Sequence, residues 1–140
     1  MEHTTPLHTG GCGCGAVRFE VHAPLQGASY CHCTRCQRRT GTAASAQAFV
    51  APGSVRIVAG AQQIRVWAPE GGFHKAFCGE CGSALFSRRP DDPEIVALRL
   101  GAFDHDPDVR PQWRGFTAFA AAWEPIPDDD LPRYPERRPQ

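Results

Sequence analysis

The sequence has no long apolar run and no excess of charge of either sign. No apolar stretch in its 140 residues approaches the roughly 18 residues of a membrane span, so we expect no membrane-spanning segment. The fifteen basic residues equal the fifteen acidic ones. Proteins that bind nucleic acid or anionic membranes normally carry a basic excess, so this balance argues against both partners.

The sequence also shows neither a signal peptide nor a disulfide framework. Its first residues, MEHTTPLHTGG, contain no basic segment and no apolar segment. We therefore predict a cytoplasmic protein, in which thiols stay reduced. Disulfides are the alternative to metal binding for the seven cysteines. Their odd number disfavours disulfides, and a bridge between Cys12 and Cys14 would be strained.

Turn-forming residues and short alternating segments predict an all-β protein. Thirteen prolines and fourteen glycines suit a turn-rich β fold. Residues 16–22 alternate between apolar and polar side chains, which is typical of a half-buried strand. We expect further strands at residues 28–33, 44–50, 54–58, 64–67, 73–77, 84–87 and 94–100. Residues 117–123 allow a helix, but their short length and their flanking glycine and proline favour a strand.

One domain is expected at this length. We place a zinc-binding domain at residues 7–125. From Pro125 onward, five prolines stand among charged residues, so residues 126–140 are predicted to form an extended tail that adds little to the core.

The cysteines fall into three tight clusters, Cys12-Gly-Cys14, Cys31-His-Cys33-Thr-Arg-Cys36 and Cys78-Gly-Glu-Cys81. Thiolates at this spacing suit a soft, tetrahedral metal ion such as zinc. A Cys-x-Cys pair on a strand directs both sulfurs to one face. A Cys-x-x-Cys turn does the same by bending the backbone, and Gly82 allows the bend to continue at positive φ.

Four cysteines close one tetrahedral site and leave three for a second. The two outer clusters can join, or the middle cluster can share ligands with either neighbour. The first partition is the simplest, because Cys31, Cys33 and Cys36 lie within six residues and need little loop closure. The outer clusters would then bridge distant segments, as a structural zinc does in a small domain. A zinc ion with four protein ligands has a structural role, whereas three thiolates leave one coordination position open for a substrate.

Zinc with three thiolates has a net charge of −1 and can hold a fourth, incoming thiolate deprotonated near neutral pH. Arg35, Arg38 and Arg39 surround the middle cluster. They either offset its negative charge, bind a substrate carboxylate, or form an ordinary solvated face. His32 lies between two cysteines on a strand and is expected to point away from the metal.

Several motifs also match a known family. They are Gly-Gly-Cys12-Gly-Cys14-Gly-x-Val-Arg-Phe, Cys31-His-Cys33-x-x-Cys36-x-Arg-x-x-Gly, Phe77-Cys78-x-x-Cys81-Gly-Ser, Leu100-Gly-x-Phe-Asp104, and Trp123 before Asp-Leu-Pro-Arg-Tyr134. Together they resemble the glutathione-dependent formaldehyde-activating enzyme and centromere protein V family. The resemblance covers nearly the whole chain and places all seven cysteines on the family pattern.

The resemblance implies a zinc-stapled β-tent of short antiparallel sheets, similar to small zinc-containing Rab-interacting exchange proteins. It implies two Zn²⁺ ions per chain: a structural zinc on Cys12, Cys14, Cys78 and Cys81, and a catalytic zinc, expected to be labile, on Cys31, Cys33 and Cys36. The implied partners are a small-molecule thiol, glutathione or similar, and formaldehyde or another small aldehyde. The implied activity forms S-(hydroxymethyl)glutathione and is classed with the carbon–sulfur lyases.

Two other functions stay open. The first is a binding module for protein or nucleic acid in which both metals are structural. Local basic patches at Arg35, Arg38 and Arg39 and at Arg137 and Arg138 would serve it, and it requires a fourth protein ligand on the second zinc. In the other, the middle cluster binds no metal and acts in redox or thiol buffering.

Overall fold

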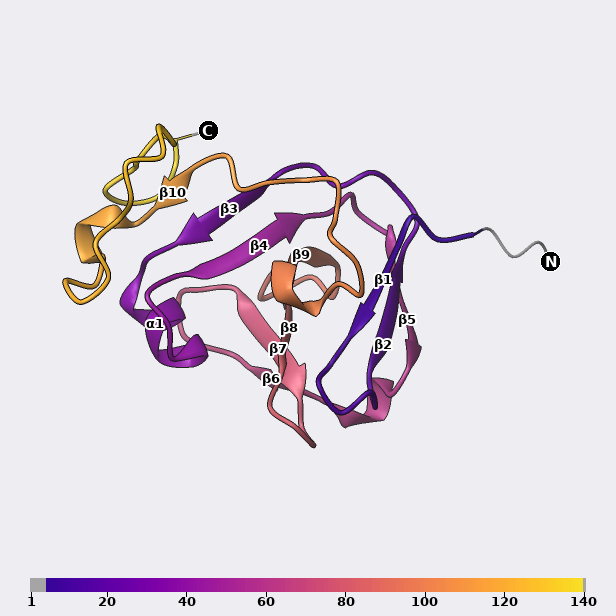
Figure 1. Ribbon diagram of the computed structural model, residues 1–140. Helices are drawn as coiled ribbons and strands as arrows, with labels where there is room; N and C mark the ends of the chain where they lie inside the picture. Colours follow the sequence, from indigo (N-terminus) through magenta and orange to yellow (C-terminus); the bar gives the residue numbers. More distant parts are fainter. Residues whose placement is uncertain (1–4, 140) are drawn as a thin grey trace.

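Two β-sheets contribute to a shared core in the computed structural model, which describes residues 5–139 (Figure 1). The smaller sheet has the strand order β1-β2-β5, and the larger has the order β10-β3-β4-β9-β8-β7-β6. All neighbouring strands are antiparallel except β10 and β3. The predicted all-β class is confirmed.

The strands are β1 (His8–Gly11), β2 (Arg18–Val21), β3 (Ala28–Cys31), β4 (Ser45–Phe49), β5 (Val55–Ala59), β6 (Ile64–Trp67), β7 (His74–Cys78), β8 (Ala84–Arg88), β9 (Ile95–Arg99) and β10 (Arg114–Gly115). The helical elements are α1 (Thr34–Thr40) and the short 3-10 helices η1 (Ala61–Gln63), η2 (Leu100–Ala102) and η3 (Thr117–Phe119). None of the helices in residues 5–139 has the length and apolar character needed to cross a membrane.

Side chains from both sheets form the core. Phe19 and Val21 of β2 pack in one cluster with Leu85 of β8 and Leu98 of β9, and all four are almost fully buried. Burying a side chain of this size contributes about 1.5–3 kcal/mol to folding. The core therefore holds the smaller sheet against one face of the larger one.

The other face of the larger sheet is polar near its centre. Cross-strand pairing places Cys31 opposite Ser45, Gln47 opposite Arg99, and Lys75 opposite Ser87. Residues directly opposite one another share a face, as do residues two apart along a strand. The polar face therefore consists of Cys31, Ser45, Gln47, Arg99, Ser87 and Lys75.

Two segments differ from the predicted elements. Residues 34–40, for which no helix was predicted, form α1, which begins after Cys33 and ends at the left-handed Gly41. The strand predicted at 117–123 is wrong, because the chain forms η3 and then turns. Phe116 has a φ of 56°, which takes the chain out of an extended path just before this segment.

The C-terminal segment, residues 117–139, lies along β10 (Figure 1). The Arg114 N–H donates to the Pro132 carbonyl and the Tyr134 N–H donates to the Arg114 carbonyl, both at 2.9 Å. Beyond them, the Phe116 N–H donates to the Glu136 carbonyl at 3.0 Å. These bonds fix the chain that follows η3 against the edge of the larger sheet.

Candidate metal centres and the adjoining cleft

Four sulfur atoms from two distant segments meet in one group. The Sγ atoms of Cys12, Cys14, Cys78 and Cys81 all lie within 4.8 Å of one another. Cys12 and Cys14 are separated by 3.6 Å and Cys14 and Cys78 by 3.9 Å. Tetrahedral zinc, with bonds of about 2.3 Å, sets its sulfurs roughly 3.8 Å apart, whereas a disulfide needs about 2.05 Å. We call this the four-sulfur group, and its donors fit a metal ion.

Backbone N–H groups and tight turns position these sulfurs. The Val17 N–H donates to the Cys12 sulfur at 3.2 Å, which stabilises negative charge on it. Gly82 has a φ of +78°, as the sequence predicts, and its N–H donates to the Cys78 carbonyl at 2.8 Å. A left-handed residue at this point lets the second turn close around the sulfurs.

The remaining cysteines form a three-sulfur group, Cys31, Cys33 and Cys36, with Sγ atoms within 4.8 Å of one another. Cys31 ends β3, Cys33 caps the start of α1, and the buried Cys36 lies in the helix. The Cys36 N–H donates to the Cys33 sulfur at 3.3 Å, so this thiol takes the place of the usual capping oxygen. In residues 5–139, no fourth histidine, cysteine or carboxylate atom joins this group.

Crowding separates the pKa values of these thiols. Hydrogen bonds from Cys31 and then Cys33 hold the pKa of Cys36 far below its ordinary value. The pKa of Cys31 is raised far above its ordinary value, first by its hydrogen bond with Cys33. One thiolate therefore forms readily, whereas deprotonating all three requires a compensating positive charge such as a metal ion.

His32 lies outside the three-sulfur group, as its position between two cysteines predicts. It is buried, and its Nε2 is 3.1 Å from a guanidinium nitrogen of Arg114. Burial and then the charge of Arg114 lower the pKa of His32. The imidazole thus helps to hold β3 against the C-terminal part of the chain.

A cleft of about 640 Å³ lies between α1 and the strands β6 to β8. Arg35, Arg38 and Arg39 line it from the helix, and Lys75 lines it from β7. Trp67, which is 44% exposed, forms part of its apolar wall. The cleft is therefore cationic on the side that carries the helix of the three-sulfur group.

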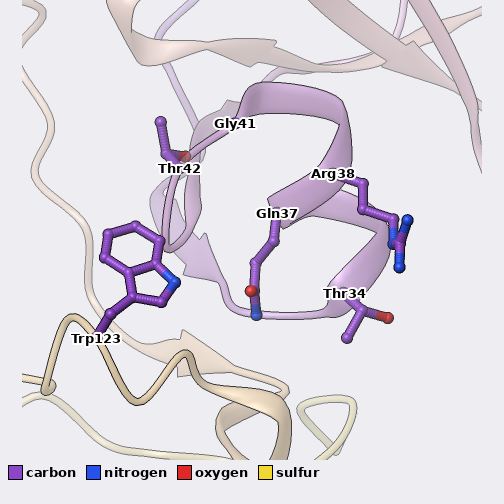
Figure 2. Close-up of a pocket in the computed structure, with 6 residues that line it drawn as sticks. All are labelled: Thr34, Gln37, Arg38, Gly41, Thr42 and Trp123. Atoms are coloured by element: carbon purple, nitrogen blue, oxygen red, sulfur yellow. The ribbon is translucent and has the colours of Figure 1, made fainter.

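A smaller hollow of about 350 Å³ lies between α1 and the C-terminal segment (Figure 2). Trp123 approaches the helix there and is 69% exposed. The side-chain amide of Gln37 donates to the carbonyls of His32 and Phe119, both at 2.8 Å, and ties the helix to this segment. Arg38 lines both the hollow and the cleft.

The comparisons with known proteins show which family this chain belongs to. Residues 7–119 match the sequence profile of the family described as glutathione-dependent formaldehyde-activating enzyme. The chain belongs to this family. The family membership that the cysteine motifs predict is thereby confirmed.

This chain is similar to a named protein and to a protein of known structure. A protein of Halomonas elongata, provisionally named as a glutathione-dependent formaldehyde-activating enzyme, is 31% identical over an alignment of 106 residues that covers 71% of this chain and 68% of the relative. The crystal structure of a Rhodobacter sphaeroides protein matches with a TM-score of 0.54 and 25% identity, over 90% of this chain and 98% of that one.

In this family member the cysteines predicted to cluster lie together, and the three predicted arginines line the cleft, but two further cations nearby were not predicted. Lys75 and Arg99 lie on the polar face, and Arg99 is only 7% exposed. Two signals could have found them. Lys75 is the single lysine among fifteen basic residues, and Arg99 interrupts the apolar end of a buried strand.

Proposed function

We propose that the chain catalyses the reversible addition of a small-molecule thiol, glutathione or similar, to formaldehyde or another small aldehyde, a carbon–sulfur lyase reaction. The observation that carries this proposal is the three-sulfur group, which lacks a fourth protein ligand among residues 5–139 and stands beside a cationic cleft. Family membership supports the choice of thiol and aldehyde.

We infer zinc at both groups, with the four-sulfur group as a closed structural site and the three-sulfur group as the catalytic one. Zinc bound by Cys31, Cys33 and Cys36 would hold the substrate sulfur as a thiolate near neutral pH. The cysteines supply three thiolates, and the Cys36 N–H stabilises the negative charge on Cys33. Such sites need reduced cysteines, which fits a cytoplasmic protein.

The proposed step is an addition that consumes neither oxidant nor reductant. The thiol gives up its S–H proton, and its sulfur donates an electron pair to the aldehyde carbon to form the C–S bond. The π pair of the C=O bond moves to the oxygen, which takes up one proton in place of the one that the thiol released. The cations of the cleft, Arg39 and Lys75 among them, place positive charge beside the group. Their potential favours both the anionic sulfur and the charge that develops on the oxygen.

Exchange spectroscopy tests this function directly. With zinc-loaded protein, glutathione and formaldehyde should interconvert with S-(hydroxymethyl)glutathione faster than in buffer. The Cys33→Ser variant should lose this acceleration and keep its circular dichroism spectrum, because Cys33 is not a member of the four-sulfur group. If the wild-type protein accelerates no exchange with a panel of thiols and aldehydes, the proposal fails.

The competing interpretation is a binding module with two closed metal sites. It needs a fourth protein ligand at Cys31, Cys33 and Cys36, and the described part of the chain supplies none. Metal content separates the two functions. An enzyme should bind two zinc equivalents, one of them labile when glutathione is added, whereas a binding module should retain both.

A further inference from the structure

Three cations, Arg39, Lys75 and Arg99, lie within electrostatic reach of one another and of the three-sulfur group, and we call them the cation cluster. Lys75 and Arg99 both donate to the hydroxyl of Ser87, the former at 3.5 Å. Nε and Nη2 of Arg39 and Nε of Arg99 are buried without a hydrogen-bond partner. Leaving such a group unpaired costs about 1–3 kcal/mol, so these atoms point to a partner that binds there.

No carboxylate among residues 5–139 forms an ion pair with the cation cluster. The ion pairs that the structure shows in residues 5–139 all involve other cations. Zinc with three thiolates contributes a single net negative charge, and a substrate thiolate would add one more. Three cations facing two negative charges leave one positive charge for a further anion.

Lys75 connects the cation cluster with the cleft. It lines the cleft and also contacts Ser87 on the polar face. Burial and then the charge of Arg99 lower the pKa of Lys75 to about 8, and the charges of Cys36 and Cys31 act in the opposite direction. A molecule in the cleft would therefore meet Lys75 within electrostatic reach of the three-sulfur group.

We propose that Arg39 and Lys75, which line the cleft, form a carboxylate-binding subsite there together with the buried Arg99 behind them, for an anionic group carried by the thiol or the aldehyde. The binding of a carboxylate does not depend on the proposed function. Only the reaction of the bound molecule rests on it. Nε and Nη2 of an arginine form one edge of the guanidinium, which matches the two oxygens of a carboxylate. This is the edge that Arg39 leaves unpaired, and Lys75 adds a further donor.

The subsite predicts substrates that bear a carboxylate near the reacting atoms. Either source of the carboxylate fits: a glutathione-like thiol, or an aldehyde with an adjoining carboxylate such as glyoxylate. Formaldehyde would then require the carboxylate to come from the thiol. Two probes distinguish the sources, namely S-methylglutathione, whose sulfur is blocked, and glyoxylate.

The single lysine allows a direct measurement of binding. Because Lys75 is the only lysine in the sequence, protein labelled with ¹³C-lysine gives one ε-methylene signal. Each probe is titrated into the labelled, zinc-loaded protein, and calorimetry gives its dissociation constant. We expect a saturable shift of the Lys75 signal with at least one probe. The probe that causes the shift identifies the source of the carboxylate.

Variants link the shift to the cation cluster. Lys75→Met should weaken binding of the active probe by about tenfold or more, the equivalent of roughly 1.4 kcal/mol, whereas Lys75→Arg should retain most of the affinity. Arg56→Met, which removes an exposed cation from β5 in the other sheet, should leave binding unchanged. The proposal is overturned if neither probe shifts the signal, or if a folded Lys75→Met protein binds as tightly as the wild type.

The two proposals fail separately. If Lys75→Met does not fold, the titration of the labelled wild-type protein still decides whether a carboxylate binds. A protein that binds the probe but accelerates no thiol–aldehyde exchange keeps the subsite and loses the proposed reaction. A protein that accelerates exchange but binds neither probe keeps the reaction and loses the subsite.

Discussion

Among single residues, Lys75 is the one that couples ligand binding to pH. Burial and then Arg99 lower its pKa from 10.5 to about 8, while Arg39 also lowers it and Cys36 and Cys31 raise it. The protonated amine is the form that attracts a carboxylate, so the bound state favours protonation. Affinity for the carboxylate probe should therefore fall as the pH rises through about 8.

Calorimetric titrations between pH 7 and pH 9.5 would measure this dependence. In Lys75→Arg the cation stays charged throughout this range, so its affinity should not show the fall near pH 8. A wild-type affinity that stays constant across the range would contradict a role for the Lys75 charge in binding.

The register of the sheet explains why the sequence predicts the sulfurs and not this lysine. The cysteine clusters are local, because their spacing alone brings Cys31, Cys33 and Cys36 together. Lys75 and Arg99 reach the same face through the pairing of β7 with β8 and of β8 with β9. This pairing register is a tertiary property, because a shift of one residue in the register would move both side chains to the opposite face of the sheet.

Gly60 is a position at which an added side chain would collide with the backbone of another segment. It has a φ of +75°, and a Cβ atom there would lie 2.0 Å from the Ala16 carbonyl oxygen. Gly53 has a similar φ of +74° but open space around it. Gly53→Ala should cost about 1–2 kcal/mol of unfolding free energy, from left-handed strain alone.

Gly60→Ala should cost clearly more than Gly53→Ala, because the backbone of Ala16 must also move. Urea denaturation of both variants, with zinc present, measures the difference in unfolding free energy. Equal costs in the two variants would show that residues near Ala16 yield easily to the added methyl group.

Among the elements, the strands follow from sequence and the irregular segments do not. Alternating side chains and turn-forming residues predict β2 and seven further strands to within two residues at each end. β1 contains two glycines and forms through pairing with β2. The sequence does not predict α1, because its polar residues show no helical pattern of apolar side chains. Its start and end are instead set by Cys33 and Gly41, which cap it.

One partly buried ion pair adds to the backbone hydrogen bonds between β10 and the C-terminal segment. Arg114, 9% exposed, donates to the Asp129 carboxylate at 2.8 Å and lies 4.3 Å from the Tyr30 ring. Asp129→Asn should lower the unfolding free energy, because the Arg114 charge stays buried without its partner. Thermal denaturation would measure it.

Asp128→Asn is the matched control, since it removes the same charge from the neighbouring, exposed residue. It should change the unfolding free energy by less than about 0.5 kcal/mol. If both variants have the same stability as the wild type, the Arg114 ion pair does not hold the C-terminal segment against β10.

At the scale of the whole molecule, the two sulfur groups connect very different lengths of chain. In the four-sulfur group, Cys14 and Cys78 are 64 residues apart. In the three-sulfur group, all three cysteines come from one short segment, residues 31–36, which runs from the end of β3 into α1. A metal ion at the first group therefore fixes distant segments to each other, whereas one at the second restrains only a local turn.

Removal of metal should consequently occur in two steps with different effects on the fold. The three-sulfur group should release zinc to a mild chelator while the circular dichroism spectrum stays unchanged. Removal from the four-sulfur group needs a stronger chelator and should unfold the chain, since a structural zinc contributes about 10–16 kcal/mol and a domain is stable by only about 5–15 kcal/mol. Cys78→Ser should mimic the second step. Release of both ions in one step, or a folded protein without metal, would contradict this division between the two groups.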